Sequence, residues 1–97
     1  MKNNSYIYII ANKNNTVLYI GVTTNIIKRI FEHRNKLVDG FSSKYCLYKL
    51  VYYEIFDDLE SALNREKQLK RWHREWKNNM IESINPNWSD IYDEIRS

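Results

Sequence analysis

The stretch that decides the fold runs from Tyr6 to Val22 and reads YIYIIANKNNTVLYIGV. Its two ends, residues 6–11 and 17–22, are rich in β-branched and aromatic residues, which is the composition of β-strands. The polar residues 12–16 between them have the composition of a turn, because asparagine tolerates unusual backbone angles and bonds to the nearby backbone. The sequence therefore predicts an antiparallel hairpin near the start of the chain.

The register of this hairpin decides which tyrosines share a face of the sheet. Residues opposite each other in an antiparallel pair point to the same face. An even number of loop residues puts Tyr8 and Tyr19 on one face with Gly21 and leaves the other face aliphatic, whereas an odd number mixes the two. The even loop is favoured because it gives one fully apolar face to bury. We expect the two tyrosines together, although spacing alone favours core packing as their role.

After the hairpin the apolar residues change to helical spacing, with one further strand-like segment. The pattern predicts an α/β (α+β) fold, in which a small three-stranded sheet starts with an antiparallel hairpin and is flanked by helices. We expect residues 1–97 to form a single domain whose tail after about residue 86 is peripheral. The expected elements are a helix from a cap at Thr24 or Asn25 to about 36–40, a third strand over 47–56, a helix from Asp57 or Asp58, and a helix over about 74–84.

Composition limits the class of protein. The chain is 43% hydrophobic with a net charge of +3, which is typical of a globular domain and not of a disordered chain. The longest apolar run, Tyr6 to Ala11, is far shorter than the about 20 residues of a membrane helix, and no signal-peptide cleavage site follows it. The single Cys46 cannot form an internal disulfide. We therefore expect a soluble, cytoplasmic protein without a membrane partner.

Positive charge is concentrated between residues 65 and 77. Such a helical region suits the phosphate backbone of nucleic acids, but it is also typical of a solvated helix face. Trp72 and Trp76 lie four residues apart within it, so they could stack on unpaired bases, although core packing is favoured. The cations of this region are Arg65, Lys67, Lys70, Arg71, Arg74 and Lys77, against the carboxylates of Glu66 and Glu75.

Three further polar residues have informative positions. Arg29 and His33 are four residues apart, so they lie on one side of the first helix; an exposed position is the ordinary expectation for such a histidine. Glu66 falls at helical spacing with apolar residues, on the face expected to look inward. A carboxylate there needs a cation, hydrogen-bond donors or a metal to offset its desolvation. An ion pair, with Arg29 or Arg65, and a metal site stay open as equal alternatives.

Taken together, these features resemble the GIY-YIG nuclease family. The resemblance rests on the tripeptides Tyr6-Ile7-Tyr8 and Tyr19-Ile20-Gly21, on Arg29 and His33, and on the helix that carries Glu66. It extends to about Trp88 and is closest to the small stand-alone bacterial subgroup described as endonucleases. Two departures are that Tyr6 stands where the family name has glycine, and that residues 22–24 lack the lysine of some members, for which Lys28 or Lys70 could substitute.

The resemblance implies a role for each residue of a catalytic set. Tyr8 would be the general base that takes a proton from the attacking water. Arg29 would favour the phenolate form of Tyr8 and stabilise the transition state at phosphorus. Glu66 would hold one Mg²⁺ (or Mn²⁺) ion. Tyr19 would position the water or Tyr8, and His33 would hydrogen-bond within the site or to phosphate.

The implied function is a metal-dependent endonuclease that hydrolyses phosphodiester bonds in DNA. The implied substrate is structured or branched DNA, and the implied process is repair or recombination. Asn85, or else Asn78, is the candidate for the family's late asparagine, and Gly21 would allow close backbone approach. No recognition domain is apparent, so DNA shape, single-stranded or branched character, or a partner protein would select the target. The alternatives are a nucleic-acid-binding module that cuts weakly or not at all, and a protein-interaction domain. The DNA-binding rim would consist of Lys67, Lys70, Arg71 and Arg74.

Overall fold

The structure, a computed structural model, describes residues 4–37 and 40–96. It confirms the expected α+β fold with a three-stranded antiparallel sheet that starts with a hairpin. The strand order is β2-β1-β3, so β1 is the central strand and pairs with both neighbours. The strands are β1 (Ser5–Ala11), β2 (Leu18–Thr23) and β3 (Lys49–Phe56).

Five helices lie in the described part of the chain, and two of them were not expected from the sequence. The expected caps are present: the side chains of Asn25 and Asp58 accept hydrogen bonds from the backbone of the first turns that follow them. None of these helices has the length and apolar character that crossing a membrane requires. The helices are α1 (Ile26–Arg34), α2 (Phe41–Lys44), α3 (Leu59–Arg71), α4 (Arg74–Ile84) and α5 (Tyr92–Arg96).

Two boundaries differ from the expectation. The first helix ends at Arg34 with Asn35 as its C-cap, earlier than the expected end near residues 36–40. Asp39, the first residue of the expected stop signal, lies outside the described residues. The second residue of that signal, Gly40, is instead the N-cap of α2 and has a φ angle of +105°. The glycine therefore starts a new helical turn, because its backbone adopts an angle that other residues rarely take.

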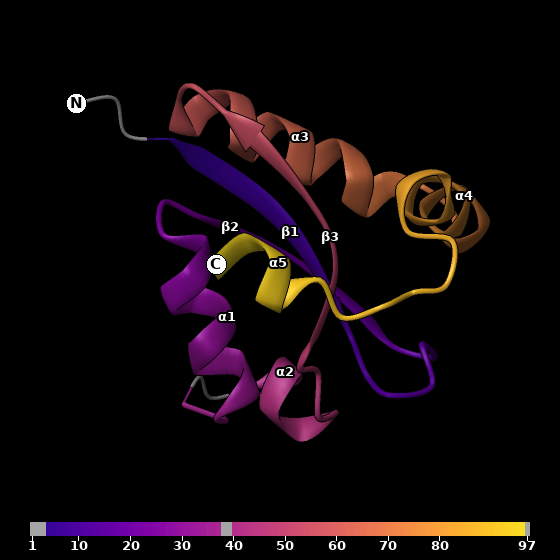
Figure 1. Ribbon diagram of the computed structural model, residues 1–97. Helices are drawn as coiled ribbons and strands as arrows, with labels where there is room; N and C mark the ends of the chain where they lie inside the picture. Colours follow the sequence, from indigo (N-terminus) through magenta and orange to yellow (C-terminus); the bar gives the residue numbers. More distant parts are fainter. Residues whose placement is uncertain (1–3, 38–39, 97) are drawn as a thin grey trace.

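The helices cover the two faces of the sheet separately (Figure 1). One face packs on α3 and α4 through the core residues Ala62, Leu69 and Ile81. The other face packs on α1 and α5 through Ile30 and Tyr92, among others. The central strand β1 contributes to both clusters, with Ile7 and Ile9 on the first side and Tyr8 and Ile10 on the second.

The hairpin has the expected even register. Ala11 pairs with Leu18, so six residues, 12–17, connect the strands. Tyr8 lies opposite Gly21, and Tyr19 lies opposite Ile10, which places both tyrosines on the face that packs against α1. The loop is held by Asn12, whose side-chain oxygen accepts hydrogen bonds from the backbone N–H groups of Thr16 and Val17 at 2.9 and 3.0 Å.

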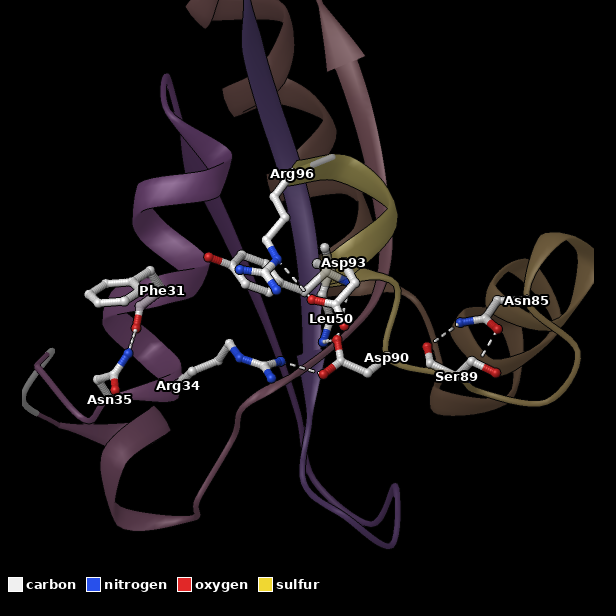
Figure 2. A network of polar contacts seen from close by, with 10 residues as sticks. Phe31, Arg34, Asn35, Leu50, Asn85, Ser89, Asp90, Asp93 and Arg96 are labelled. Atoms are coloured by element: carbon white, nitrogen blue, oxygen red, sulfur yellow. Dashed lines mark hydrogen bonds and ion pairs between the residues drawn. The ribbon is translucent and has the colours of Figure 1, made fainter.

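The C-terminal segment is attached to the sheet by a network of polar contacts (Figure 2). Asp90 forms an ion pair with Arg34 of α1 and accepts hydrogen bonds from the backbone N–H groups of Leu50 and Tyr92 at 3.2 and 3.1 Å. Tyr92 is buried, with the Arg34 guanidinium 4.8 Å above its ring. This segment was expected to be peripheral, but Tyr92 packs in the core cluster beneath α1.

We predict that Asp90→Ala lowers the free energy of unfolding by about 1–3 kcal/mol, because the backbone N–H of Leu50 loses a charged acceptor at a partly buried position. Urea unfolding followed by circular dichroism measures this change. Asp93→Ala is the matched control, since its carboxylate is 76% exposed and pairs only with Arg96 on the same helix. Equal effects of the two substitutions would contradict a role for Asp90 as an anchor.

Candidate active site

The Tyr8 ring lies in the centre of the domain. Its side chain is 1% exposed, and it packs over Gly21 of the neighbouring strand β2. A Cβ atom at position 21 would stand 2.3 Å from the Tyr8 hydroxyl oxygen, which is an impossible contact. Gly21 therefore permits a close approach, as the sequence suggested, and the group that approaches it here is the tyrosine ring.

His33 links Tyr8 to a residue that the sequence analysis did not identify. Its Nε2 atom lies 3.0 Å from the Tyr8 hydroxyl and its Nδ1 atom lies 2.8 Å from the hydroxyl of Ser42 in α2. Both His33 and Ser42 are 4% exposed. His33 is therefore buried, whereas an exposed position is the ordinary expectation for a histidine on a helix. No sequence signal marks Ser42, because a four-residue helix is too short to show periodicity.

The protonation states of this chain of groups follow from their burial. Desolvation, followed by the positive charge of Arg29, lowers the pKa of His33, so the imidazole is neutral near pH 7. A neutral imidazole has one N–H donor and one acceptor. His33 therefore accepts a hydrogen bond from one of the two hydroxyls, of Tyr8 or of Ser42, and donates a hydrogen bond to the other. The result is a continuous row of hydrogen bonds between Tyr8, His33 and Ser42.

Tyr19 completes a group of three rings. Its ring centroid lies 6.3 Å from that of Tyr8 and 5.8 Å from that of His33, and the Tyr8 and His33 centroids are 5.6 Å apart. The rings are tilted against one another by 43–56°, which is a favourable aromatic arrangement. The two tyrosines that the register places on one face are thus in direct contact.

Burial dominates the electrostatics of the Tyr8 hydroxyl. It raises the pKa of Tyr8 to about 12, assisted by Tyr19 and by the negative charge of Glu66, while Arg29 acts in the opposite direction. The sequence analysis expected positive charge to favour the phenolate. Arg29 does have that effect, but it is smaller than the cost of placing a phenolate in the core. The resting site therefore contains the neutral phenol.

Arg29 also faces a cavity beside the ring group. Its side chain is 40% exposed and contacts Glu32 at 3.4 Å. The cavity has a volume of about 470 Å³ and lies between the end of β2, the first turns of α1 and the start of α3. It is lined by Val22, Thr23, Thr24, Asn25, Lys28, Arg29, Glu32 and Leu59. Two cations and two threonine hydroxyls make this lining suitable for a phosphate group.

Glu66 on α3 acts on Tyr8 through its charge. Its side chain is 18% exposed, and its carboxylate forms an ion pair with Lys70 at 3.4 Å. The ion pair considered from the sequence, with Arg29 or Arg65, is not the one observed: Arg65 instead binds Glu54 at 2.9 Å. Glu66 is close enough to raise the pKa of Tyr8, so it belongs to the same electrostatic unit.

The comparisons with known proteins agree with this arrangement. The model of the GIY-YIG catalytic domain matches residues 4–79, which is most of the chain. The chain belongs to the GIY-YIG family. Members of this family are generally metal-dependent endonucleases, and the two tripeptides that give the family its name are the strand segments that carry Tyr8 and Tyr19 here.

Three relatives illustrate the relationship. A UPF0213 protein of Staphylococcus haemolyticus is 38% identical over 81 residues, which cover 79% of this GIY-YIG chain and 93% of the relative. A UPF0213 protein of Clostridium perfringens is 37% identical over 83 residues, or 81% and 84% of the two chains. The solution NMR structure of a UPF0213 protein from Bacillus halodurans is similar in fold, with a TM-score of 0.57 and 24% identity over 90% and 92% of the chains.

The family implies a metal ion, and the donor set of this chain can be compared with that requirement. Within residues 4–37 and 40–96, no group of three or more His, Cys, Asp or Glu side chains is placed to hold a metal. Mg²⁺, however, is typically bound through one or two carboxylates, with waters and substrate phosphates as the other ligands. Glu66, which is partly exposed and whose charge acts on Tyr8, fits a site of this single-carboxylate kind.

The structure brings together five of the predicted site residues and separates the others. Tyr8, Tyr19, Arg29, His33 and Glu66 interact through ring contacts, hydrogen bonds or charge. Asn85 does not join them: it is buried, its amide N–H donates to the backbone carbonyl of Val51, and its amide also bonds to the backbone of Ser89 (Figure 2). Its observed contacts attach the C-terminal segment to β3.

The basic residues of the predicted rim differ in their surroundings. Lys67 and Arg71 are exposed on α3, and Lys70, which is 53% exposed, is the partner of Glu66. Arg74 donates hydrogen bonds to the carbonyl oxygens of Asn15 and Thr16, so it holds the hairpin loop against α4. Two of the four residues of the predicted basic rim, Lys70 and Arg74, therefore already have partners within this GIY-YIG chain.

We predict that alkaline pH destabilises the protein through Tyr8. The folded state retains the phenol proton up to about pH 12 and the unfolded state only up to about pH 10, so this stability is complete below pH 10 and lost as the pH rises through 12. The contribution of Tyr8 to the unfolding free energy should be about 1.4 kcal/mol lower near pH 11 than near pH 8. Urea unfolding at both pH values checks this.

Tyr52, whose pKa burial also raises to about 12, provides the comparison. Tyr8→Phe and Tyr52→Phe should each remove a similar part of the alkaline loss of stability, because each deletes one buried phenol. An alkaline loss that is unchanged in Tyr8→Phe would show that the Tyr8 hydroxyl ionises as easily in the folded protein as in the unfolded chain.

Proposed function

We propose that this chain is a metal-dependent endonuclease that hydrolyses phosphodiester bonds in DNA. The observation that carries the proposal is the buried hydrogen bond between the Tyr8 hydroxyl and His33, under the opposing electrostatic influence of Arg29 and Glu66. Core packing alone does not require these three polar side chains to act on one tyrosine. Strongly perturbed groups beside a cavity are typical of functional sites, and the family to which the chain belongs is a nuclease family.

In this mechanism Tyr8 is the general base, and His33 is the first acceptor of its proton. In the tautomer that carries its proton on Nδ1, the neutral imidazole can receive the phenol proton at Nε2, 3.0 Å away, while Nδ1 keeps its hydrogen bond to Ser42. The phenolate can then take a proton from the attacking water. Arg29, which faces the cavity, stabilises both the phenolate and the negative charge that develops at phosphorus.

The proton transfer is unfavourable in the resting site, because the pKa of Tyr8 is raised and that of His33 is lowered. Glu66 contributes to this barrier, since its negative charge raises the pKa of Tyr8. Glu66 would hold a Mg²⁺ or Mn²⁺ ion, and the positive charge of that ion would polarise the phosphate and offset the negative influence of Glu66 on Tyr8. Arg29 assists from the other side of the phenol by stabilising its anionic form.

A nucleic-acid-binding module that cuts weakly or not at all is the second candidate function. The raised pKa of Tyr8 favours it, because a phenol that holds its proton up to about pH 12 is a poor base near pH 7. The two candidates differ in their need for the Tyr8 hydroxyl. Binding through the basic residues of α3 does not depend on it, whereas cleavage by the proposed mechanism does.

We predict that Tyr8→Phe lowers DNA cleavage by at least about 100-fold, the usual effect of losing a general base, and leaves the fold intact. The assay uses labelled single-stranded, duplex, flapped and branched DNA, with Mg²⁺ or Mn²⁺ and with chelator. Tyr53→Phe is the matched control, because Tyr53 pairs with Tyr8 across β1 and β3, and its hydroxyl makes no side-chain hydrogen bond to the residues that the structure describes. Cleavage that persists in Tyr8→Phe would exclude Tyr8 as the base; no metal-dependent cleavage by the wild type would favour the binding module.

We predict that Glu66→Gln abolishes metal-dependent cleavage and leaves DNA affinity unchanged or higher, because one negative charge is removed. The matched control is Lys70→Gln, which breaks the same ion pair but keeps the carboxylate. This exposed pair contributes at most about 1 kcal/mol, so thermal unfolding should change little in either variant. If Glu66→Gln unfolds the protein, or if Lys70→Gln abolishes cleavage equally, the carboxylate acts through the ion pair.

A further inference from the structure

The short helix α2 presents two exposed aromatic rings beside the candidate active site. Phe41 is 47% exposed and Tyr45 is 41% exposed, and their ring centroids are only 4.7 Å apart. The Phe41 ring also lies 6.2 Å from that of Tyr19. The rings of Tyr8, Tyr19, Phe41 and Tyr45 thus form a continuous row that leads from the buried hydroxyl to the surface.

This row is held in place by α2, which lies beside the C-terminal end of α1 (Figure 1). Ser42, the residue between the two rings in sequence, is buried and bonded to His33. Leu47, just after the helix, is 1% exposed, and its backbone N–H bonds to the carbonyl of Ser42 at 2.9 Å. The exposed rings therefore stand on a fixed support, so little side-chain freedom is lost when they bind a ligand.

A positive charge lies beside the Tyr45 ring. Lys44 lies between Phe41 and Tyr45 in sequence, and its ammonium group stands 5.5 Å from the centre of the Tyr45 ring. Residues 40–48 contain no acidic side chain. Two exposed rings with a cation beside them are complementary to a nucleotide, whose base stacks on aromatic side chains while its phosphate meets the positive charge.

We propose, on the basis of the function proposed above, that Phe41 and Tyr45 stack on an unpaired base next to the scissile phosphate. Base pairs of a continuous duplex are stacked on both sides, so the rings can reach only a base that is unstacked. The substrate class that this surface selects is single-stranded DNA, or the single-stranded part of a flap. The row of rings places the stacked base directly beside the Tyr8 site.

The test measures binding and is independent of cleavage. Fluorescence anisotropy compares a labelled single strand with the duplex of the same sequence, in the Tyr8→Phe background so that the DNA stays intact. Phe41→Leu with Tyr45→Leu should weaken single-strand binding by at least about fivefold, the fold-change that loss of one weak stacking contact produces. Duplex binding should stay unchanged. Phe41→Trp should retain single-strand affinity, because it keeps a ring at this position.

Phe31→Leu is the matched control, since Phe31 is 51% exposed on α1 and makes no ring contact with this row. Thermal unfolding of each variant establishes that the fold is kept. The stacking surface would be overturned if the ring variants lost affinity equally for single strand and duplex, or lost affinity for neither. It would also be overturned if Trp76→Leu, and not the ring variants, weakened single-strand binding. Cleavage is measured separately, with Tyr8 intact. Ring-dependent single-strand binding with no cleavage by the protein with Tyr8 intact would support the surface and contradict the nuclease. Cleavage by that protein that does not depend on the rings would support the nuclease and contradict the surface.

Discussion

The central position of β1 is the constraint on which the site depends. A strand with a neighbour on each side and helices over both faces is buried throughout, and residues 7–11 have exposures of 0–1%. Tyr8 is therefore a core residue first, and its hydroxyl must find a partner inside the protein. His33 provides that partner and is itself satisfied by Ser42. The same packing that stabilises the sheet fixes the position of the Tyr8 oxygen.

This position creates an electrostatic balance that the surface groups can change. Burial keeps the phenol neutral, and the two groups that act on it with opposite signs, Arg29 and Glu66, are both partly exposed. Ligands can reach these two partly exposed charges, whereas they cannot reach the buried phenol directly. A phosphate beside Arg29 or a cation on Glu66 alters the balance without any movement of β1, so the site can be rigid in structure and variable in charge.

The sequence predicts the hairpin well because only one register separates aliphatic from aromatic residues. Arg29 and His33 follow from helical spacing, since four residues are one turn. The partner of Glu66 does not follow, because α3 places Lys70 one turn away while Arg65 reaches Glu54 on another element. Ser42 and Tyr92 also escape prediction: they lie in helices of four and five residues, too short for a periodic pattern.

Positions 8 and 21 share a single volume, which has a consequence for how this site can change over time. The Tyr8 ring fills the space above Gly21, so a side chain at position 21 requires the ring to move. If the ring is lost first, position 21 becomes free to vary. Substitutions at this pair therefore have a favoured order. Among descendants of this sequence, a glycine retained at position 21 is expected wherever the Tyr8 ring keeps its present place, and its replacement would indicate that the ring had been lost or displaced.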